Sequence, residues 1–161
     1  MLHVRSLKDT DTEIFTRLFA EYYAELDCPD DAAHLVGEYI IPDMLAGLLH
    51  VDLIADDGQV CGFVIYQIDD IDNEWNFKEG WGDVREIYVS PSRRGCGLGK
   101  FLLYSAEMKL REAGAQTAYC LPYEKAIPFF TACGYENSAE YCEDLACTVF
   151  EKRSLINCCN E

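Results

Sequence analysis

A short glycine-rich stretch, residues 94–100, sets the strongest limit on the structure of this chain. It follows an apolar run over residues 84–89 and precedes a helical pattern over residues 101–113. Glycines let the backbone turn sharply because no Cβ stands in the way. The N–H groups of a first helical turn have no partner inside the helix, so they can point at an anion. The order of strand, glycine-rich turn and helix therefore predicts a phosphate-binding turn. The residues predicted to bind there are Arg94, Gly95, Cys96, Gly97, Leu98, Gly99 and Lys100.

The spacing of the glycines separates the common classes of phosphate loop. A dinucleotide fingerprint G-x-G-x-x-G that starts at Gly95 would need a glycine where the sequence has Lys100. An ATP-binding loop G-x-x-x-x-G-K-[ST] would need a glycine in place of Arg94 and a hydroxyl residue in place of Phe101. The pattern that fits is Arg-x-x-Gly-x-Gly, beginning at Arg94. It resembles the acyl-CoA pyrophosphate loop of the GNAT N-acetyltransferases, and a plain strand-to-helix turn is the alternative for the motif alone.

The residues around the loop extend this resemblance. Residues 86–91 (Glu-Ile-Tyr-Val-Ser-Pro) are similar to the family's central strand running into its V-x-P motif. Residues 102–103 resemble the start of its helix, and residues 126–135 resemble the segment written A-x-x-x-Y-x-x-x-G-[FY]. Residues 145–155 resemble its last strand. The resemblance covers residues 84–152, and before them only the order of elements agrees.

Length and composition indicate one globular domain over residues 1–161. Half of the 161 residues are apolar, which is enough for a sizeable core. No apolar stretch approaches the roughly 18 residues of a membrane helix, and the first residues lack the pattern of a secretory signal. With the resemblance, we expect a single acyl-CoA-binding N-acetyltransferase domain.

Nine cysteines are scattered from Cys28 to Cys159 without a C-x-x-C pair. An odd, dispersed set in a chain without a visible secretory signal is typical of reduced thiols that pack as small apolar residues. We therefore expect a cytoplasmic protein with no metal site. The adjacent Cys158 and Cys159 are expected to be incidental.

The chain is strongly acidic, with 29 Asp and Glu against 13 Lys and Arg and a formal net charge of −16. Nucleic acids and anionic membrane surfaces require a basic patch, so neither is expected as a partner. A cationic acceptor, such as a polyamine, an aminoglycoside or a basic peptide, is compatible with this charge. An acidic surface that only aids solubility is the simpler explanation.

The apolar pattern predicts alternating strands and helices. Strands are expected over residues 2–7, 51–55, 60–68, 84–89, 117–121 and 145–152, and helices over 11–26, 28–49 with a break at Pro42, 101–113 and 125–133. The sequence Asp-Asp-Gly-Gln at residues 56–59 is a strong hairpin signal. This order matches the GNAT fold, so the expected class is α/β (α+β). It predicts a single domain with a mixed central sheet of about six to seven strands and about four flanking helices.

Two segments are candidates for the acceptor site. Tyr22 and Glu25 lie where the resembled family often builds its acceptor pocket, although the apolar stripe of that helix is also typical of a core-facing helix. In the polar loop over residues 69–83, Trp75 and Trp81 are interleaved with acidic residues. Aromatics among carboxylates suit recognition of a cation by charge and by ring faces. A solvated loop pinned by its tryptophans is the alternative.

The resemblance also implies where acetyl-CoA, the expected co-substrate, binds. In the family the pantetheine arm pairs with exposed backbone of the central strand, which corresponds here to Ile87, Tyr88 and Val89. The phosphates rest on the backbone N–H groups of residues 94–100. A backbone N–H of the strand would face the thioester oxygen, because the negative charge that grows there needs donors already in place.

Glu86 is the candidate general base, because many family members carry a base at this strand position, often acting through water. Partial desolvation beside a bound cofactor favours proton uptake by such a carboxylate. Asp83 and Glu79 are the alternates. Glu86 could instead be structural, pair with the substrate or bond to Arg85.

The general acid is where the sequence departs from the family. The family's usual tyrosine, four residues before the glycine of G-[FY], is Phe130 here, which has no proton to give. Tyr123 is the candidate replacement; it could instead bond the pantetheine arm, because the family often has an asparagine there. Cys120 and Cys133 are other nearby groups. A thiol with a pKa near ~8.5 also leaves without much help, so no side chain is required.

The predicted activity is acetyl-CoA-dependent transfer of an acetyl group to a primary amine of a small molecule or peptide, by direct attack in a ternary complex. A non-catalytic acyl-CoA-binding sensor or interaction module is the alternative, and Phe130 is its best support. A different phosphate-ligand enzyme that uses the same loop is a third option. The acceptor, the acyl chain length and the oligomeric state, a homodimer included, are left open.

Overall fold

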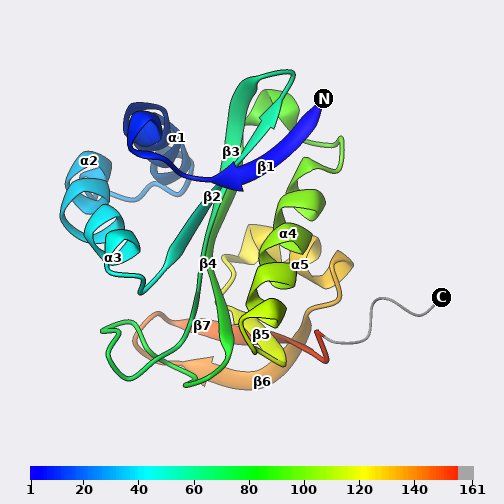
Figure 1. Ribbon diagram of the computed structural model, residues 1–161. Coiled ribbons are helices and arrows are strands. Elements are labelled where there is room, and N and C mark those ends of the chain that lie inside the picture. Colours follow the sequence, from blue (N-terminus) through cyan, green and yellow to red (C-terminus); the bar gives the residue numbers. More distant parts are fainter. Residues whose placement is uncertain (156–161) are drawn as a thin grey trace. The chain divides into compact units, whose positions relative to one another are not determined.

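The computed structural model describes residues 1–155 (Figure 1). The adjacent Cys158 and Cys159 lie outside these residues. The strands are β1 (Leu2–Ser6), β2 (His50–Asp56), β3 (Gln59–Ile68), β4 (Gly82–Val89), β5 (Thr117–Cys120), β6 (Glu136–Cys142) and β7 (Cys147–Arg153). The helices are α1 (Thr12–Glu25), α2 (Ala32–Leu35), α3 (Ile41–Leu45), α4 (Leu98–Glu112) and α5 (Ile127–Ala132).

The strands form one sheet in the order β1-β2-β3-β4-β5-β7-β6. The pair β4–β5 is parallel, whereas β1–β2, β2–β3, β5–β7 and β6–β7 are antiparallel. The α/β class with a mixed central sheet, predicted from the sequence, is confirmed. The chain divides into two compact units, residues 1–66 with 86–106, and residues 67–85 with those from 107 onward.

In the first unit, β2 and β3 form the hairpin that the sequence predicts. Asp56 lies opposite Gln59 in the antiparallel register. The two turn residues between them, Asp57 and Gly58, have φ values of 49° and 80°. A tight hairpin turn of this kind needs positive φ at both central positions, which glycine and aspartate tolerate better than other residues.

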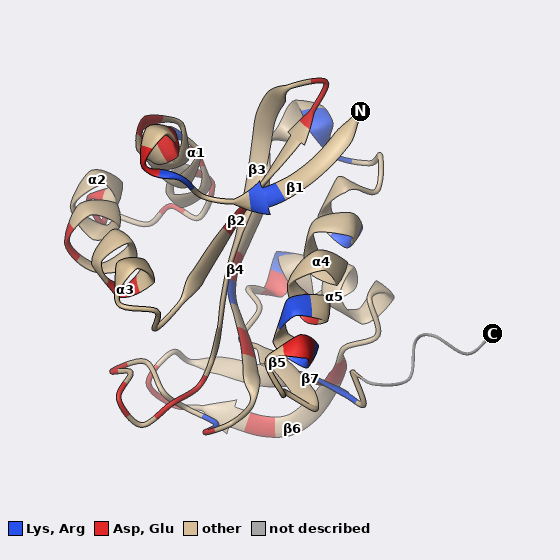
Figure 2. Ribbon diagram, viewed as in Figure 1, with Lys and Arg blue, Asp and Glu red and all other residues tan. Residues whose placement is uncertain are grey.

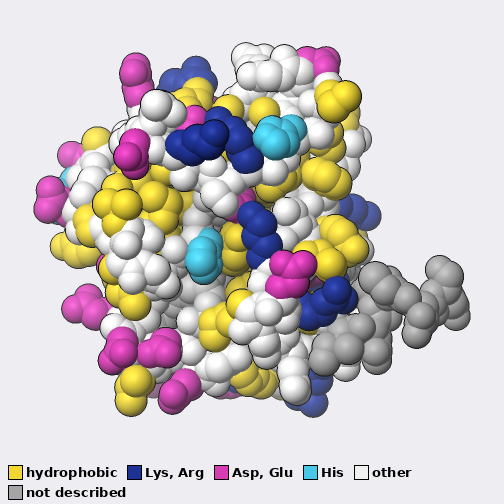
Figure 3. Space-filling view, in the orientation of Figure 1, with side chains coloured by type: hydrophobic (Ala, Val, Ile, Leu, Met, Phe, Trp, Pro, Cys, Tyr) yellow, Lys and Arg dark blue, Asp and Glu magenta, His cyan; other side chains and the backbone are white. Residues whose placement is uncertain are grey.

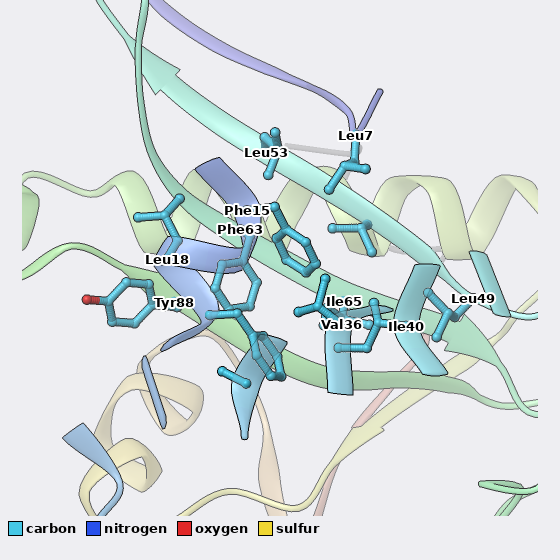
Figure 4. Packing of buried hydrophobic residues seen from close by; sticks show 13 residues of the cluster. Leu7, Phe15, Leu18, Val36, Ile40, Leu49, Leu53, Phe63, Ile65 and Tyr88 are labelled. Atoms are coloured by element: carbon cyan, nitrogen blue, oxygen red, sulfur yellow. The ribbon is translucent and has the colours of Figure 1, made fainter. Parts of the chain in front are cut away.

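The core of the first unit lies between its helices and strands β2 and β3. Helices α1, α2 and α3 lie together on one side of β1–β3 in Figure 1. Phe15 of α1 is fully buried and meets Phe63 of β3 edge-on, with ring centroids 5.2 Å apart. Figure 4 shows Leu53 and Ile65 in the same cluster. Burying each such side chain contributes about 1.5–3 kcal/mol, so this cluster fixes α1 against the strands.

The segment between α1 and β2 differs from the sequence prediction at Pro42. Pro42 was expected to break a helix, but the helical path continues through it. The chain passes from α2 through a π-helical turn, Val36–Ile40, into α3, where Pro42 lies in the first turn. The proline has no N–H to donate to the turn before it, and the π-helical turn at that place, in which the Ile41 N–H donates to the carbonyl oxygen of Val36, accommodates it.

Asp11 anchors the chain at the start of α1. Its carboxylate accepts hydrogen bonds from both terminal nitrogens of Arg5, at 2.5 and 2.8 Å, and from the backbone N–H of Lys8 at 2.9 Å. The side-chain bond from Arg5 is the main reason why the pKa of Asp11 falls to about 2. The chain between β1 and α1 is therefore held by a charged pair that is largely buried.

The second unit contains a strand that the sequence did not predict. Strand β6 pairs antiparallel with β7, and five of its seven residues are exposed. Ala139 has a positive φ of 63° where the register shifts between Asn137 and Tyr141. An exposed strand with this irregularity shows no apolar alternation, which is the signal that reveals strands in a sequence.

The acidic character predicted from composition is visible on the folded chain. Figure 2 shows acidic positions along the loop that joins β3 to β4. In the space-filling view of Figure 3, Lys and Arg side chains lie in several separate groups on this face, with Asp and Glu among them. Among residues 1–155, no helix has the length and apolar character needed to span a membrane.

Candidate functional site

The predicted phosphate loop joins β4 to α4 within the first unit. After Val89 the chain makes a short 3-10 turn, Pro91–Arg93, then passes Gly95 and Gly97 and enters α4 at Leu98. The two glycines have φ values of 79° and 82°, a left-handed conformation that other residues adopt rarely. Within the described part of the chain, nothing lies within 4 Å of a Cβ built on either glycine. The loop thus has open space beside its backbone.

The first turn of α4 supplies the donors that an anion requires. The Phe101 N–H donates to the carbonyl oxygen of Gly97 at 3.1 Å. The N–H groups of Leu98, Gly99 and Lys100 precede this bond, and they belong to the set that a helix leaves without intrahelical partners. The positive end of the helix dipole lies at the same place. The Lys100 side chain is exposed.

The side chain of Arg94 is held by the protein itself. Its Nε donates to the carbonyl oxygen of Val89 at 2.7 Å. Its Nη2 donates to both carboxylate oxygens of Glu25, at 2.8 and 2.9 Å. The guanidinium carbon also lies 5.4 Å from the ring centroid of Tyr88. Arg94 therefore connects the loop to β4 and to the last turn of α1, and its backbone N–H donates to the carbonyl oxygen of Pro91 at 3.3 Å.

Glu86, the candidate general base, is half-buried in β4. The hydroxyl of Tyr22, in α1, donates a hydrogen bond to its Oε2. The structure thus joins the candidate base to a residue that the sequence placed in the acceptor pocket. Of the two alternate bases, Asp83 is buried and Glu79 is exposed.

Tyr88 is buried with its ring in the core of the first unit, and Figure 4 shows its hydroxyl directed away from the labelled apolar side chains. The hydroxyl donates to Oε2 of Glu21 at 3.4 Å. Burial, and next the charges of Glu25 and Glu21, raise the pKa of Tyr88 to about 12. Tyr88 therefore stays protonated at neutral pH and can act as a donor but not as a base.

The part of β4 predicted to hold the pantetheine arm follows its pairing with β5. That ladder contains Gly82 opposite Ala118 and Asp83 opposite Tyr119. The predicted binding residues come later in the strand: Ile87 is half-buried, and Tyr88 and Val89 are buried. For these residues the relevant groups are backbone N–H and C=O, so burial of the side chains is compatible with the predicted role.

The second unit contains the candidate general acid. Tyr123 precedes the short 3-10 turn Glu124–Ala126, and its side chain is half exposed. Phe130, at the family's usual tyrosine position, is buried and meets the ring of Tyr135 edge-on at 5.4 Å. A phenylalanine packed in this way has an apolar role only.

The loop between β3 and β4 is pinned by Asp69, a buried residue that the sequence did not single out. Its carboxylate accepts from the backbone N–H groups of Phe77 and Lys78, at 2.9 and 2.8 Å. It also accepts from the hydroxyl of Tyr119 at 2.5 Å and from Gln67 at 3.0 Å. One buried carboxylate with several donors fixes the start of the loop to its middle, so the loop is pinned by Asp69, whereas the sequence alternative assigned this role to its tryptophans.

The two tryptophans of this loop already contact cations of the chain. The ammonium of Lys78 lies 4.5 Å from the ring centroid of Trp81, and the guanidinium carbon of Arg85 lies 5.8 Å from that of Trp75. Lys78 also forms an ion pair with Glu140 at 2.5 Å. The aromatic faces predicted to bind a cationic acceptor are therefore each near an internal cation.

Sequence reasoning missed Glu21 as a member of this site. Glu21 and Glu25 are four residues apart in α1, so they lie on one face of the helix, and each contacts a residue of β4 or of the loop. The helical period could have placed Glu21 beside Glu25. Nothing in the local pattern, however, identifies Tyr88 as its partner.

The chain is similar in sequence to known acetyltransferases. A family model described as "Acetyltransferase (GNAT) family" matches residues 9–135. Over 99 residues the chain is 31% identical to an uncharacterized N-acetyltransferase of Lactobacillus delbrueckii subsp. lactis. That match covers 58% of this chain and 57% of the relative, so the chain matches somewhat over half the length of this curated protein.

The fold is similar to solved structures over nearly the whole chain. The PaiA N-acetyltransferase of Thermoplasma acidophilum, in complex with coenzyme A, has a TM-score of 0.71 at 15% identity and covers 95% of this chain and 99% of that one. A GNAT family acetyltransferase of Brucella melitensis, in complex with acetyl-CoA, has a TM-score of 0.66 at 19% identity and covers 95% and 88%. At these identities the likeness concerns the fold.

Proposed function

Because the chain belongs to the GNAT acetyltransferase family, we propose that it transfers an acetyl group from acetyl-CoA to a primary amine of a small molecule or peptide. The observation that carries this proposal is the loop between β4 and α4. Its glycines at positions 95 and 97 have positive φ and open space beside them, and the N–H groups of the first turn of α4 follow directly.

The residues present fit acetyl-CoA, which supplies the acyl group as a thioester. The backbone of residues 94–100 would hold the diphosphate, and Ile87, Tyr88 and Val89 would hold the pantetheine arm through their main chain. Two of the structural neighbours, from Thermoplasma acidophilum and Brucella melitensis, are complexes with coenzyme A and acetyl-CoA. The similarity of fold supports the same ligand here.

Glu86 is the proposed general base. A free alkylamine has a pKa near ~10, so it must lose a proton before it can attack. A carboxylate that is half-buried and oriented by a hydrogen bond, as Glu86 is by Tyr22, can accept this proton directly or through water. The amine then attacks within a ternary complex, where orientation alone can contribute roughly 7–11 kcal/mol.

Cationic amines are the acceptor class to test first. The net charge of −16 favours their approach, and Glu21, Glu25 and Glu86 are placed together around the end of α1 and the end of β4. Arg94 pairs with Glu25 and offsets its charge, but the carboxylates of Glu21 and Glu86 keep the net charge of this group negative.

A second candidate function is an acyl-CoA-binding module that catalyses no transfer. One observation favours it: Phe130 is buried where the family usually has a tyrosine. The proposed transferase has Tyr123 as its candidate acid, and a thiol with a pKa near ~8.5 also leaves without much help. The two functions therefore differ in turnover and not in acetyl-CoA binding.

An assay of thiol release separates the two candidates. Purified protein with acetyl-CoA is supplied with polyamines, aminoglycosides, amino acids and peptide N-termini in turn, and free coenzyme A is measured. Release that depends on one acceptor class supports the transferase and names its substrate. Binding of acetyl-CoA without release across the panel supports the module. Absence of both binding and release contradicts both proposals.

A further inference from the structure

The hydrogen bond between Tyr22 and Glu86 joins two elements of the first unit that are far apart in the sequence. Tyr22 lies in the second half of α1, and Glu86 lies in β4, 64 residues later. The Tyr22 hydroxyl donates to Oε2 of Glu86. A hydroxyl that donates to a carboxylate stabilises its ionised form. The bond therefore affects both the orientation and the charge state of the candidate base.

The ring of Tyr22 is fixed by other aromatic rings, so its hydroxyl is held in place. Its centroid lies 5.6 Å from that of Tyr88, 5.9 Å from that of Phe63 and 6.2 Å from that of Phe19. The contacts with Phe63 and Phe19 are edge-on, an arrangement that aromatic pairs prefer. Figure 4 shows Phe63 and Tyr88 close together in the core cluster. A donor built on such a rigid base is pre-organised for one position of the carboxylate.

The neighbouring charged groups Glu21, Glu25 and Arg94 have partners of their own. From α1, Glu21 accepts from the Tyr88 hydroxyl, and Glu25 pairs with Arg94 of the loop. Tyr88 of β4 stays neutral, because burial raises its pKa to about 12. The cation of Arg94 is thus directed to Glu25, whereas the Tyr22 hydroxyl donates to Glu86.

Resting on the proposed acetyl transfer, we propose that Tyr22 is a positioning residue for the reaction: it orients the Glu86 carboxylate and keeps it ionised. In the step that it supports, the ammonium form of the acceptor loses one proton to Glu86, and the nitrogen electron pair that this frees forms the new C–N bond. The thiolate leaves with the electron pair of the C–S bond and takes up the second N–H proton, which gives the amide and the free thiol. Tyr22 itself touches neither reacting atom. This role differs from the acceptor contact expected from the sequence.

The variant Tyr22→Phe tests this role because it keeps the ring and removes the hydroxyl. We expect kcat/KM at neutral pH to fall about tenfold, as for loss of one hydrogen bond to a charged group. The acidic limb of the pH–rate profile should move to higher pH by about one unit, because the ionised carboxylate loses a stabilising donor. The dissociation constant for acetyl-CoA should not change. An unshifted limb with full activity overturns the proposal.

Tyr66→Phe is the matched control. The Tyr66 hydroxyl donates to the carboxylate of Asp52 at 2.9 Å, and both residues are buried in the same unit. This variant also removes one tyrosine–carboxylate hydrogen bond, but away from the proposed base. It should lower the melting temperature and leave the acidic limb in place. A limb that moves equally in both variants would show a general structural effect and contradict the positioning role.

NMR titration of the Glu86 carboxyl group tests the positioning role of Tyr22 without a measurement of turnover. In protein labelled with ¹³C at glutamate carboxyl carbons, the Glu86 signal is identified by its loss in Glu86→Gln. Its titration midpoint should move up by about one pH unit in Tyr22→Phe and stay in place in Tyr66→Phe. An unmoved midpoint overturns the inference even if the enzyme is active. A moved midpoint in a protein without turnover supports the Tyr22 contact and contradicts the transferase.

Discussion

Arg94 ties the phosphate loop to the last turn of α1 by contacting both carboxylate oxygens of Glu25. The same guanidinium donates to the carbonyl oxygen of Val89, where β4 ends. Two residues that the sequence assigned to different ligands, one to the cofactor and one to the acceptor, are therefore partners. The side chain of Arg94 acts on the proposed cofactor site by shaping the loop.

Removing this anchor should weaken acetyl-CoA binding slightly. In Glu25→Gln the loop loses an ion pair whose members are 45% and 38% exposed, and such a pair is worth at most about 1 kcal/mol. We expect the dissociation constant, measured by calorimetry, to rise by up to about fivefold. Glu13→Gln, an exposed carboxylate at the other end of α1, is the control for charge. Equal affinities of Glu25→Gln and the unmodified protein would contradict a shaping role.

Gly62 should not tolerate a side chain. A Cβ at this position would lie 2.4 Å from the carbonyl oxygen of Tyr88 and 3.0 Å from Cγ2 of Ile54. The backbone of β4 would have to move, so Gly62→Ala should destabilise the fold by about 1–3 kcal/mol. Urea unfolding measures this change.

Gly37→Ala is the matched change at an open position. No described atom lies within 4 Å of its Cβ, and an alanine restricts the unfolded chain. It should be neutral or should stabilise by about 0.4–1 kcal/mol. If the two variants have the same unfolding midpoint, the close approach of β3 and β4 at Gly62 is incorrect.

Asp11 makes stability depend on pH at the acidic end. Its pKa is about 2 in the folded chain, against an ordinary value of 3.8, so the folded state favours the ionised form. The contribution, about 2 kcal/mol, is present above pH ~4 and is lost as the pH falls through ~2. Asp11→Asn should thus be less stable than the unmodified protein at pH 6, and the difference should shrink by pH ~2 and vanish below it.

The control for this prediction is Asp9→Asn, which changes an exposed carboxylate in the same turn. Its free energy of unfolding should differ little from that of the unmodified protein at pH 6. A constant difference between Asp11→Asn and the unmodified protein from pH 6 to pH 2 would disprove the charged pair with Arg5.

Glu86→Gln tests the proposed base. Acetyl-CoA binding should be retained, because the phosphate loop does not use this side chain. The rate of thiol release at pH 7 should fall by about 10²-fold, a typical value for loss of general base catalysis. The rate should recover in part as the pH rises toward the amine pKa near ~10, where more acceptor is neutral. Normal turnover at pH 7 would show that another group takes the proton.

The sequence predicts well those parts of the fold that depend on the conformational preferences of neighbouring residues. The turn at Asp57 and Gly58 requires positive φ, and the sequence supplies residues that accept it. Strand β6 was missed because its exposed residues give no apolar period. The effect of Pro42 was misjudged because a π-helical turn directly before it lets the helical path continue, and the sequence pattern does not show where such a turn forms.

The candidate site also has a part that the sequence predicts and a part that it does not. The loop at Gly95 and Gly97 could be predicted because its chemistry belongs to the backbone and its spacing is local. The pairs Tyr22–Glu86 and Glu25–Arg94 join residues 64 and 69 positions apart. Such pairs depend on how α1 packs against the strands, and no local pattern in one sequence records that packing.

Isothermal titration calorimetry with acetyl-CoA on the unmodified chain, Gly97→Asp and Gly47→Asp tests cofactor binding at the loop. Gly47 matches Gly97 in its positive φ, 77° against 82°, and in the open space that the structure shows beside it, but it lies outside the loop. We predict saturable binding to the unmodified chain and to Gly47→Asp, and a loss of at least about tenfold in Gly97→Asp, where a carboxylate would face the diphosphate. No heat with the unmodified chain, or equal affinities in all three proteins, would contradict the proposal that this loop holds coenzyme A.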